Sequence, residues 1–249
     1  MDTPEHQENP EIREVILSQA EAALNEVFSD YRSQGLAAVY LWGSVLREDF
    51  NPESSDVDSI GIAQDQTPFE LEQEIQSRLM EKIPSIKKFG FRIIYSSELA
   101  GGPIKGFLSS VQSPKSHLLD LPNWQLVAGR DFKQSDFATE LPTFHEAMLD
   151  EIPELRRHQQ NYEAGDVEDY PNFIKKIAQI VDLLQKERGA SGRFSYSEIL
   201  SRAAEGLEKQ TAAALVEIKS AGYDAQVIKK HDKTLKEFIN YIYSLVRER

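Results

Sequence analysis

The feature that most constrains this chain is a pair of short apolar segments joined by a fixed pattern of small and acidic residues. The first segment, residues 36–42, is too short for a helix and is bounded by glycines, so it predicts a buried strand. Gly43 and Ser44 follow it, and eleven residues then separate Ser44 from Asp56. A second apolar segment, residues 57–63, predicts the adjacent strand. The spacer is long enough for one helical turn and a loop back to that strand.

The residues at the end of the first strand have the chemistry of a phosphate site. A glycine such as Gly43 lets a phosphate approach the backbone closely. The hydroxyl of Ser44 and the N–H groups that follow it can donate to anionic oxygens, particularly where they begin a helical turn. Arg47 lies one turn further on and can reach the same phosphates. Gly43, Ser44 and Arg47 are therefore candidate nucleotide-binding residues.

Two aspartates at the start of the second strand are candidate metal ligands. Strand side chains alternate, so Asp56 and Asp58 project from one face, with Cα atoms roughly 6–7 Å apart, while Val57 points into the core. Mg²⁺ prefers one or two carboxylates together with phosphate and water oxygens. We therefore expect Asp56 and Asp58 to hold Mg²⁺, with Mn²⁺ as the alternative ion. The competing interpretation is a Gly-Ser turn followed by two capping or solvated aspartates.

At these residues the chain resembles the polymerase-β nucleotidyltransferase superfamily. The signature of that superfamily is Gly-Ser, about ten intervening residues and Asp-x-Asp. Arg47 and residues 55–58, SDVD, resemble its small bacterial and archaeal branches, which include the aminoglycoside nucleotidyltransferases and minimal enzymes paired with helical partner proteins. The resemblance covers residues 11–95 and extends to LVAGRDF, residues 126–132. The remainder resembles the antibiotic-modifying branch in architecture only.

The resemblance implies a reaction as well as a fold. A nucleoside monophosphate, AMP, would pass from a magnesium-bound triphosphate, ATP, to a hydroxyl of a small molecule or protein, with release of pyrophosphate. Asp56 and Asp58 would be the catalytic metal ligands. Catalysis would rest mainly on positioning and charge neutralisation.

One departure from the family pattern lies on the third expected strand, residues 89–95. Many members carry a carboxylate there, but Gly90 or Arg92 occupies the expected place, and the nearest acid is Glu98, just past the strand. The third acid is the usual candidate for a general base or a second-metal ligand. Its absence leaves open a slow or one-metal enzyme. It also leaves open a nucleotide-binding regulatory or antitoxin-like module that acts on, or binds, a protein partner.

Two domains are expected, because the pattern of segments changes near residues 135–142. We expect residues 1–138 to form an α/β (α+β) nucleotidyltransferase domain with a short mixed sheet. We expect residues 139–249 to form an all-α helical bundle. In the first half we expect helices over residues 11–34 and 68–83 and strands over 36–42, 57–63 and 89–95. Residues 124–129 predict either one more strand or a closing turn. In the second half we expect helices over residues 143–161, 167–188, 196–206, 209–221 and 225–247.

Composition narrows the partners and the setting. The net charge is −13 and no dense basic patch is present, so long nucleic acid is a disfavoured partner. The chain has no cysteine, which excludes disulfides and thiolate chemistry. No apolar run approaches the roughly 20 residues of a membrane span, and the polar N-terminus does not resemble a signal peptide. We therefore expect a cytoplasmic protein.

The helical half is expected to supply the acceptor site, because its acidic residues suit an amine-bearing acceptor. The acids in question are Glu146, Asp150, Glu151, Glu154, Glu163, Asp166, Glu168 and Asp169. Lys176, on the flank of an apolar helical stripe, is expected either to snorkel at the edge of the core or to reach the triphosphate. The scattered histidines, among them His117 and His158, lack metal-ligand spacing and are expected to be neutral core or surface residues.

Overall fold

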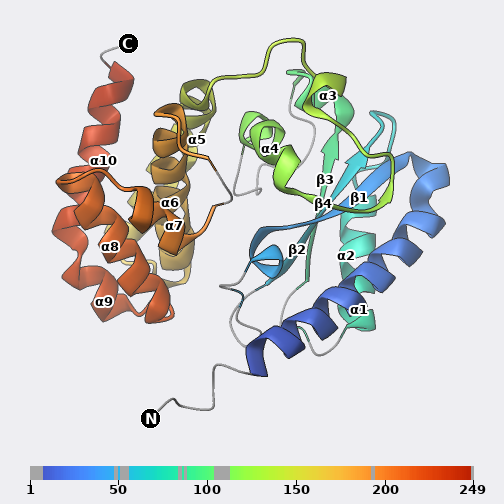
Figure 1. The fold of residues 1–249 in the computed structure, drawn as a ribbon, viewed down its shortest axis with the longest axis horizontal. Coiled ribbons are helices and arrows are strands. Elements are labelled where there is room, and N and C mark those ends of the chain that lie inside the picture. The colour runs from blue at the N-terminus through green and yellow to red at the C-terminus, as the bar shows by residue number, and fades with distance from the viewer. Residues whose placement is uncertain are drawn as a thin grey trace. The chain divides into compact units, whose positions relative to one another are not determined.

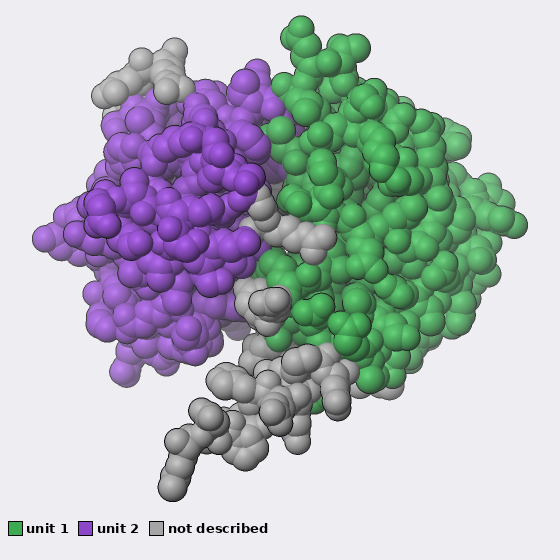
Figure 2. Space-filling view, viewed as in Figure 1, with its two compact units in different colours: residues 1–110, 117–141 green, residues 111–116, 142–249 purple. Residues whose placement is uncertain are grey.

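The computed structural model describes residues 8–47, 50, 56–83, 86, 89–103, 113–191 and 194–247. The chain divides into two compact units (Figure 2). Unit 1 comprises residues 1–110 and 117–141, and unit 2 comprises residues 111–116 and 142–249. The expected boundary at residues 138/139 stays a prediction, because compactness alone does not show that either part folds by itself.

Unit 1 is built on a four-stranded mixed sheet, as the sequence predicted. Its strands are β1 Leu36–Trp42, β2 Val57–Ala63, β3 Phe89–Tyr95 and β4 Gln125–Gly129. The strand order is β3-β2-β1-β4. β1 runs antiparallel to both β2 and β4, while β2 and β3 are parallel. The end of β1 and the starts of β2, β3 and β4 therefore lie at one edge of the sheet.

The parallel pair requires a crossover, because consecutive parallel strands cannot be joined by a tight hairpin. Helix α2, Leu71–Lys82, lies in the connection between β2 and β3. It begins three residues later than the sequence predicted, because Phe69 and Glu70 form a turn before the helix. Its buried residues Leu71, Ile75 and Leu79 follow the helical spacing of an apolar stripe.

Helices cover both faces of the sheet (Figure 1). Helix α1, Glu8–Tyr31, packs with α2 on one face, where Leu24, Val27 and Val57 are buried in one core cluster. Helix α3, Ser96–Leu99, and the C-terminal part of α4, Pro114–Asp120, contribute to a second cluster on the opposite face. Ile60 and Ile62 of β2 belong to this second cluster. Asp58 alternates with them, so its side chain is on the face opposite Val57.

Among the described residues of unit 2, all the regular elements are helices, as predicted. Its helices are α5 Phe144–Glu163, α6 Tyr170–Glu187, α7 Tyr196–Arg202, α8 Leu207–Ser220, α9 Ala225–Lys230 and α10 Asp232–Arg247. The single helix expected over residues 225–247 is in fact two, α9 and α10. The His231 N–H bonds to the carbonyl of Ile228, three residues back, which interrupts the α-helical ladder. Across the described parts of the chain, no helix is both long and apolar enough to span a bilayer.

Candidate active site

The end of β1 delivers a tight turn to the edge of the sheet. Gly43 has a φ of +80°, a left-handed conformation that glycine adopts without steric cost. It opens a 3-10 turn, Gly43–Leu46, in which Val45 is buried and the Arg47 N–H donates to the Ser44 carbonyl at 2.9 Å. The helical turn expected after the first strand is therefore present and fixed by its own packing.

The structure brings this turn next to the start of β2. The Ser44 hydroxyl donates to the backbone carbonyl of Asp56 at 3.3 Å, although the two residues are twelve positions apart. Arg47 is half-buried, and its carbonyl accepts a hydrogen bond from Arg13 of α1 at 3.4 Å. Residues 48–49 and 51–55 of the spacer lie outside the described part of the chain. Ser44, Arg47 and Asp56 thus lie at one end of the sheet, and their role in binding phosphate stays a prediction.

The carboxylate of Asp58 lies between two glycines. Asp58 is the register partner of Trp42 on β1 and of Gly90 on β3. A Cβ atom on Gly43 would lie 3.1 Å from Asp58 Oδ2, and one on Gly90 would lie 2.7 Å from Oδ1. The two glycines therefore leave space beside both carboxylate oxygens that any side chain would fill.

The register identifies which residue stands in place of the third acid. Gly90 is level with Asp58, whereas Arg92 is level with Ile60. The Arg92 guanidinium instead contacts the buried Glu72 carboxylate of α2, with Nη1 and Oε1 2.7 Å apart. Gly90 is thus the strand position beside the Asp58 carboxylate, and it has no room for a third acidic side chain.

Glu98 does not replace the missing acid. It follows Tyr95, which is the register partner of Ala63 at the end of β2 remote from Asp58. Its Oε2 accepts the Tyr95 N–H at 2.9 Å, and the residue is buried. Glu98 therefore caps helix α3 at the opposite end of the strand.

Two carboxylates and their surroundings fit a magnesium ion. Asp56 and Asp58 are hard oxygen ligands of the kind that Mg²⁺ prefers, and glycines rather than side chains lie beside both oxygens of Asp58. Within the described ranges, no group of three or more His, Asp or Glu side chains is arranged to hold a metal. A metal at this site would therefore take its remaining ligands from phosphate and water oxygens.

A cluster on the same face of the sheet carried no signal in the sequence. Asp120 Oδ2 accepts the indole N–H of Trp42 at 2.8 Å and that of Trp124 at 3.3 Å. The ring of His117 lies 5.6 Å from the ring of Trp42 and 5.7 Å from that of Trp124, edge-on to both. Trp124 is buried in the core. Asp120 is 78 positions from Trp42, so no local pattern links them.

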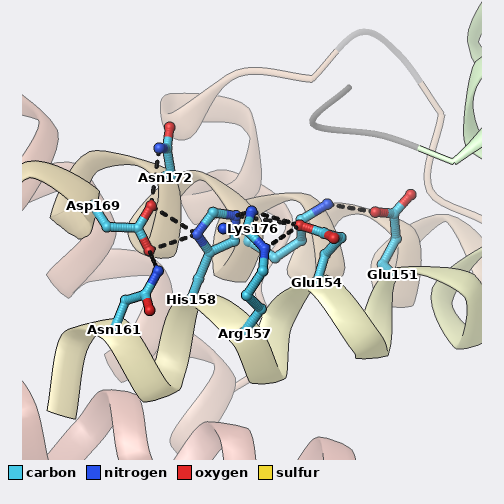
Figure 3. Close-up of polar contacts among 8 residues, drawn as sticks. All are labelled: Glu151, Glu154, Arg157, His158, Asn161, Asp169, Asn172 and Lys176. Atoms are coloured by element: carbon cyan, nitrogen blue, oxygen red, sulfur yellow. Dashed lines mark hydrogen bonds and ion pairs between the residues drawn. The ribbon is translucent and has the colours of Figure 1, made fainter. Parts of the chain in front are cut away.

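In unit 2 both alternatives for Lys176 are wrong, because it neither snorkels at the edge of the core nor reaches toward a phosphate. Lys176 is fully buried and pairs with the Glu151 carboxylate, which is itself 1% exposed (Figure 3). Glu151 also accepts the Ser113 N–H and the Ser116 hydroxyl, each at 2.7 Å. Apolar periodicity did not reveal this, because a lysine amine is buried only where another helix supplies its partner.

Some of the acidic residues that were expected to line an acceptor site in the helical half are buried and hydrogen-bonded within unit 2. Buried Asp169 accepts hydrogen bonds from His158 Nδ1 at 2.7 Å, from Asn161 at 2.9 Å and from Asn172 at 3.0 Å (Figure 3). Burial opposes ionisation, but these hydrogen bonds hold the pKa of Asp169 below its ordinary value. Sequence analysis expected His158 to lie either in the core or on the surface. It is buried and hydrogen-bonded to the Asp169 carboxylate.

Comparison with known proteins bears on the fold. Neither a family model nor a curated protein matches the sequence. Among solved structures, the crystal structure of spectinomycin adenyltransferase AAD(9) from Enterococcus faecialis with ATP and spectinomycin matches with a TM-score of 0.59. The match covers 91% of this chain and 99% of that chain, at 9% sequence identity. The chain therefore has the fold of that adenyltransferase. At this identity the likeness confirms the fold expected from the Gly-Ser and Asp-x-Asp pattern.

Proposed function

We propose that this chain is a metal-dependent nucleotidyltransferase that moves AMP from ATP to a hydroxyl group and releases pyrophosphate. The observation that carries the proposal is the Asp58 carboxylate, which lies between Gly43 and Gly90 at the edge where Ser44 contacts Asp56. A nucleotidyltransferase fold gives that arrangement its context. A cytoplasmic setting, which supplies ATP and Mg²⁺, belongs to the same proposal.

Each candidate residue has a defined role in the proposal. The backbone at Gly43, the Ser44 hydroxyl and the Arg47 guanidinium donate to oxygens of the β- and γ-phosphates. Asp56 and Asp58 hold the metal. When bound, Mg²⁺ neutralises triphosphate charge and favours in-line displacement at the α-phosphorus.

The bond changes balance without a covalent enzyme intermediate. The acceptor oxygen forms a bond to the α-phosphorus as the bond between that phosphorus and the pyrophosphate oxygen breaks. The hydroxyl proton leaves to solvent or to a substrate phosphate. Gly90 beside Asp58 offers no carboxylate for this proton, and a positioned base is worth about 10²–10⁴-fold in rate. We therefore expect slow turnover.

A small-molecule acceptor is the class we favour. The neighbouring structure contains ATP and spectinomycin, which supports a nucleotide donor and a small acceptor for a chain of this fold. The net charge of −13 disfavours a long polyanionic acceptor. A protein hydroxyl is the alternative acceptor.

A second candidate function is supported by the glycine on β3. A chain with Gly90 at the position of the third acid could bind a nucleotide and act on a protein partner as a regulatory or antitoxin-like module. That module would bind Mg-ATP with the same residues and transfer nothing. Measurement of binding and of transfer on one preparation separates the two candidates.

The test combines calorimetry with a transfer assay. A non-hydrolysable ATP analogue is titrated with and without Mg²⁺ into wild type, Asp56→Ala, Asp58→Ala and the control Asp30→Ala, whose carboxylate is on the exposed surface of α1. We expect metal-dependent affinity in wild type and the control and its loss in the other two. Wild-type-like, metal-dependent affinity in the double variant Asp56→Ala/Asp58→Ala would reject the assignment. Label transfer from α-³²P-ATP to small hydroxyl compounds or proteins then identifies the acceptor class.

A further inference from the structure

Four residues form a row across the end of the sheet that carries the candidate site. Gly90 on β3 is level with Asp58 on β2, and Asp58 is level with Trp42 on β1. Trp124 immediately precedes β4, whose first residue pairs with the neighbour of Trp42. Trp42 and Trp124 both pack into the core cluster on the Asp58 face of the sheet. The row therefore leads from the metal carboxylate to a pair of indole rings.

One carboxylate ties the indole end of this row together. Asp120 Oδ2 accepts the Trp42 N–H at 2.8 Å and the Trp124 N–H at 3.3 Å, while Oδ1 accepts the Asn123 amide at 2.9 Å. The described partners of Asp120 are thus neutral N–H donors. Asp120 is therefore a firm anchor for the Trp42 indole.

The Trp42 side chain is held next to both parts of the candidate site. It precedes Gly43 in the chain and pairs with Asp58 across the strands. Its ring is held at the nitrogen by Asp120 and contacts the edge of His117. The Gly43 backbone already approaches Asp58 closely, since a Cβ there would lie 3.1 Å from Oδ2. A shift of Trp42 would therefore displace the phosphate-binding turn and the metal carboxylate relative to each other.

We propose that Asp120 is a positioning residue for the metal and triphosphate site, acting through the Trp42 indole N–H. The inference rests on the proposed role of Asp58 and adds a residue outside the Gly-Ser and Asp-x-Asp pattern. Asp120 contributes a hydrogen-bond acceptor at a fixed place, so an amide oxygen at the same position substitutes for it. Residues that orient metal ligands without touching the metal commonly change metal affinity by about 10–100-fold.

The test measures Mg²⁺-dependent binding of a non-hydrolysable ATP analogue to the full chain. Asp120→Ala removes the acceptor, and Trp42→Phe removes the N–H while it keeps an aromatic ring. We expect each to weaken binding about tenfold, and the double variant to be no weaker than either single one, because both break the same contact. Asp120→Asn retains most of the affinity. Trp124→Phe, which loses the longer bond, has a smaller effect than Trp42→Phe.

Tyr40→Phe is the matched control for a purely structural role. The Tyr40 hydroxyl donates to the Arg130 carbonyl at 3.0 Å and accepts the Phe132 N–H at 2.9 Å, in the same core cluster. Its removal lowers Tm but keeps the aromatic ring and the bond between Asp120 and the Trp42 N–H, so we expect affinity to stay at the wild-type value. If Asp120→Ala loses no more affinity than this control at a similar loss of Tm, the positioning role is wrong. Should Asp120→Ala not fold, Trp42→Phe and Asp120→Asn decide the question by the same comparison.

The Asp58→Ala variant separates this inference from the proposed function. If Asp58→Ala keeps metal-dependent binding, the assigned site itself is wrong and the inference falls with it. If Asp58→Ala loses that binding while Trp42→Phe and Asp120→Ala keep it, the site is correct and only the role of Asp120 is overturned.

Discussion

The Asp58 carboxylate and the Gly90 backbone exclude a side chain between them, because a Cβ at Gly90 would lie 2.7 Å from Asp58 Oδ1. The register makes the two residues direct neighbours on parallel strands. Glycine at this place therefore sets the position of the Asp58 carboxylate and leaves no third acid beside it.

We expect Gly90→Ala to damage metal binding more than stability. The atom it would meet is the far end of a flexible side chain, so the Asp58 carboxylate rotates away while the strand persists. Affinity for the Mg²⁺ complex of an ATP analogue should fall about tenfold, with a small change in Tm. Arg92→Ala, two residues along β3, is the control that leaves this affinity unchanged. Unchanged affinity in Gly90→Ala would show that the Asp58 carboxylate can accommodate the added methyl group without losing the metal complex.

Ser44→Ala and Arg47→Ala should weaken binding of ATP more than binding of AMP. Both residues are in or next to the turn after β1, where the outer phosphates are expected. Charge-assisted hydrogen bonds of this kind are worth roughly 1.5–3 kcal/mol each. Calorimetric titration of both nucleotides into each variant measures the difference, with Arg32→Ala on the exposed surface as the control. Equal losses for ATP and AMP would contradict a role in reading the phosphate tail.

We expect that removing one partner of the buried Lys176–Glu151 pair destabilises the protein. Replacing both partners together should cost much less stability. Lys176→Met leaves an unpaired buried carboxylate, for which we expect a loss of about 3–5 kcal/mol in the free energy of unfolding. Lys176→Met/Glu151→Gln should recover most of it, because the glutamine oxygen still accepts from Ser113 and Ser116. Urea denaturation provides the measurement.

The exposed pair Lys236–Asp232 is the matched control for this prediction. Lys236→Met should change the free energy of unfolding by less than about 0.5 kcal/mol. If Lys176→Met/Glu151→Gln were as unstable as Lys176→Met alone, the attraction between the two charges would itself stabilise unit 2. The loss in Lys176→Met would then not come from leaving Glu151 without its cation.

The Asp169 carboxylate should stabilise the fold in a pH-dependent way. Its pKa in the folded protein is below the ordinary value, which is about 3.9. The contribution is therefore complete above about pH 4 and is lost as pH falls through the folded pKa. Asp169→Asn should cost roughly 1.5–3 kcal/mol at pH 5, and its difference from wild type should shrink towards pH 2.5. A difference that stays constant over this range would show that ionisation of Asp169 does not contribute.

The strands were predictable from the sequence because their signals are local. The runs at residues 36–42, 57–63 and 89–95 are apolar, short and bounded by turn residues, and β1, β2 and β3 have these bounds. The choice between Gly90 and Arg92 as the residue beside Asp58 was not predictable, because strand register depends on pairing between distant segments.

Whether a residue of the candidate site could be predicted from the sequence also depended on whether its neighbours in space are close to it in the chain. Gly43, Ser44 and the two aspartates follow one another within a strand–turn–strand unit, so spacing alone brings them together. Asp120 and Trp42 meet only through the packing of α4 on the sheet. Lys176 looked like a flanking polar residue of an amphipathic helix, and its burial depends on Glu151 of another helix.

The two tryptophans of the row across the sheet also make the intrinsic fluorescence of the protein a probe of unit 1. The chain has two tryptophans, Trp42 and Trp124, and both belong to unit 1 at the Asp58 edge of the sheet. Their emission therefore reports on the surroundings of two side chains in unit 1, while far-ultraviolet circular dichroism includes helices α5 to α10 of unit 2. Denaturation curves from the two signals, taken on the unlabelled protein, reveal directly whether the units melt in one transition or in two.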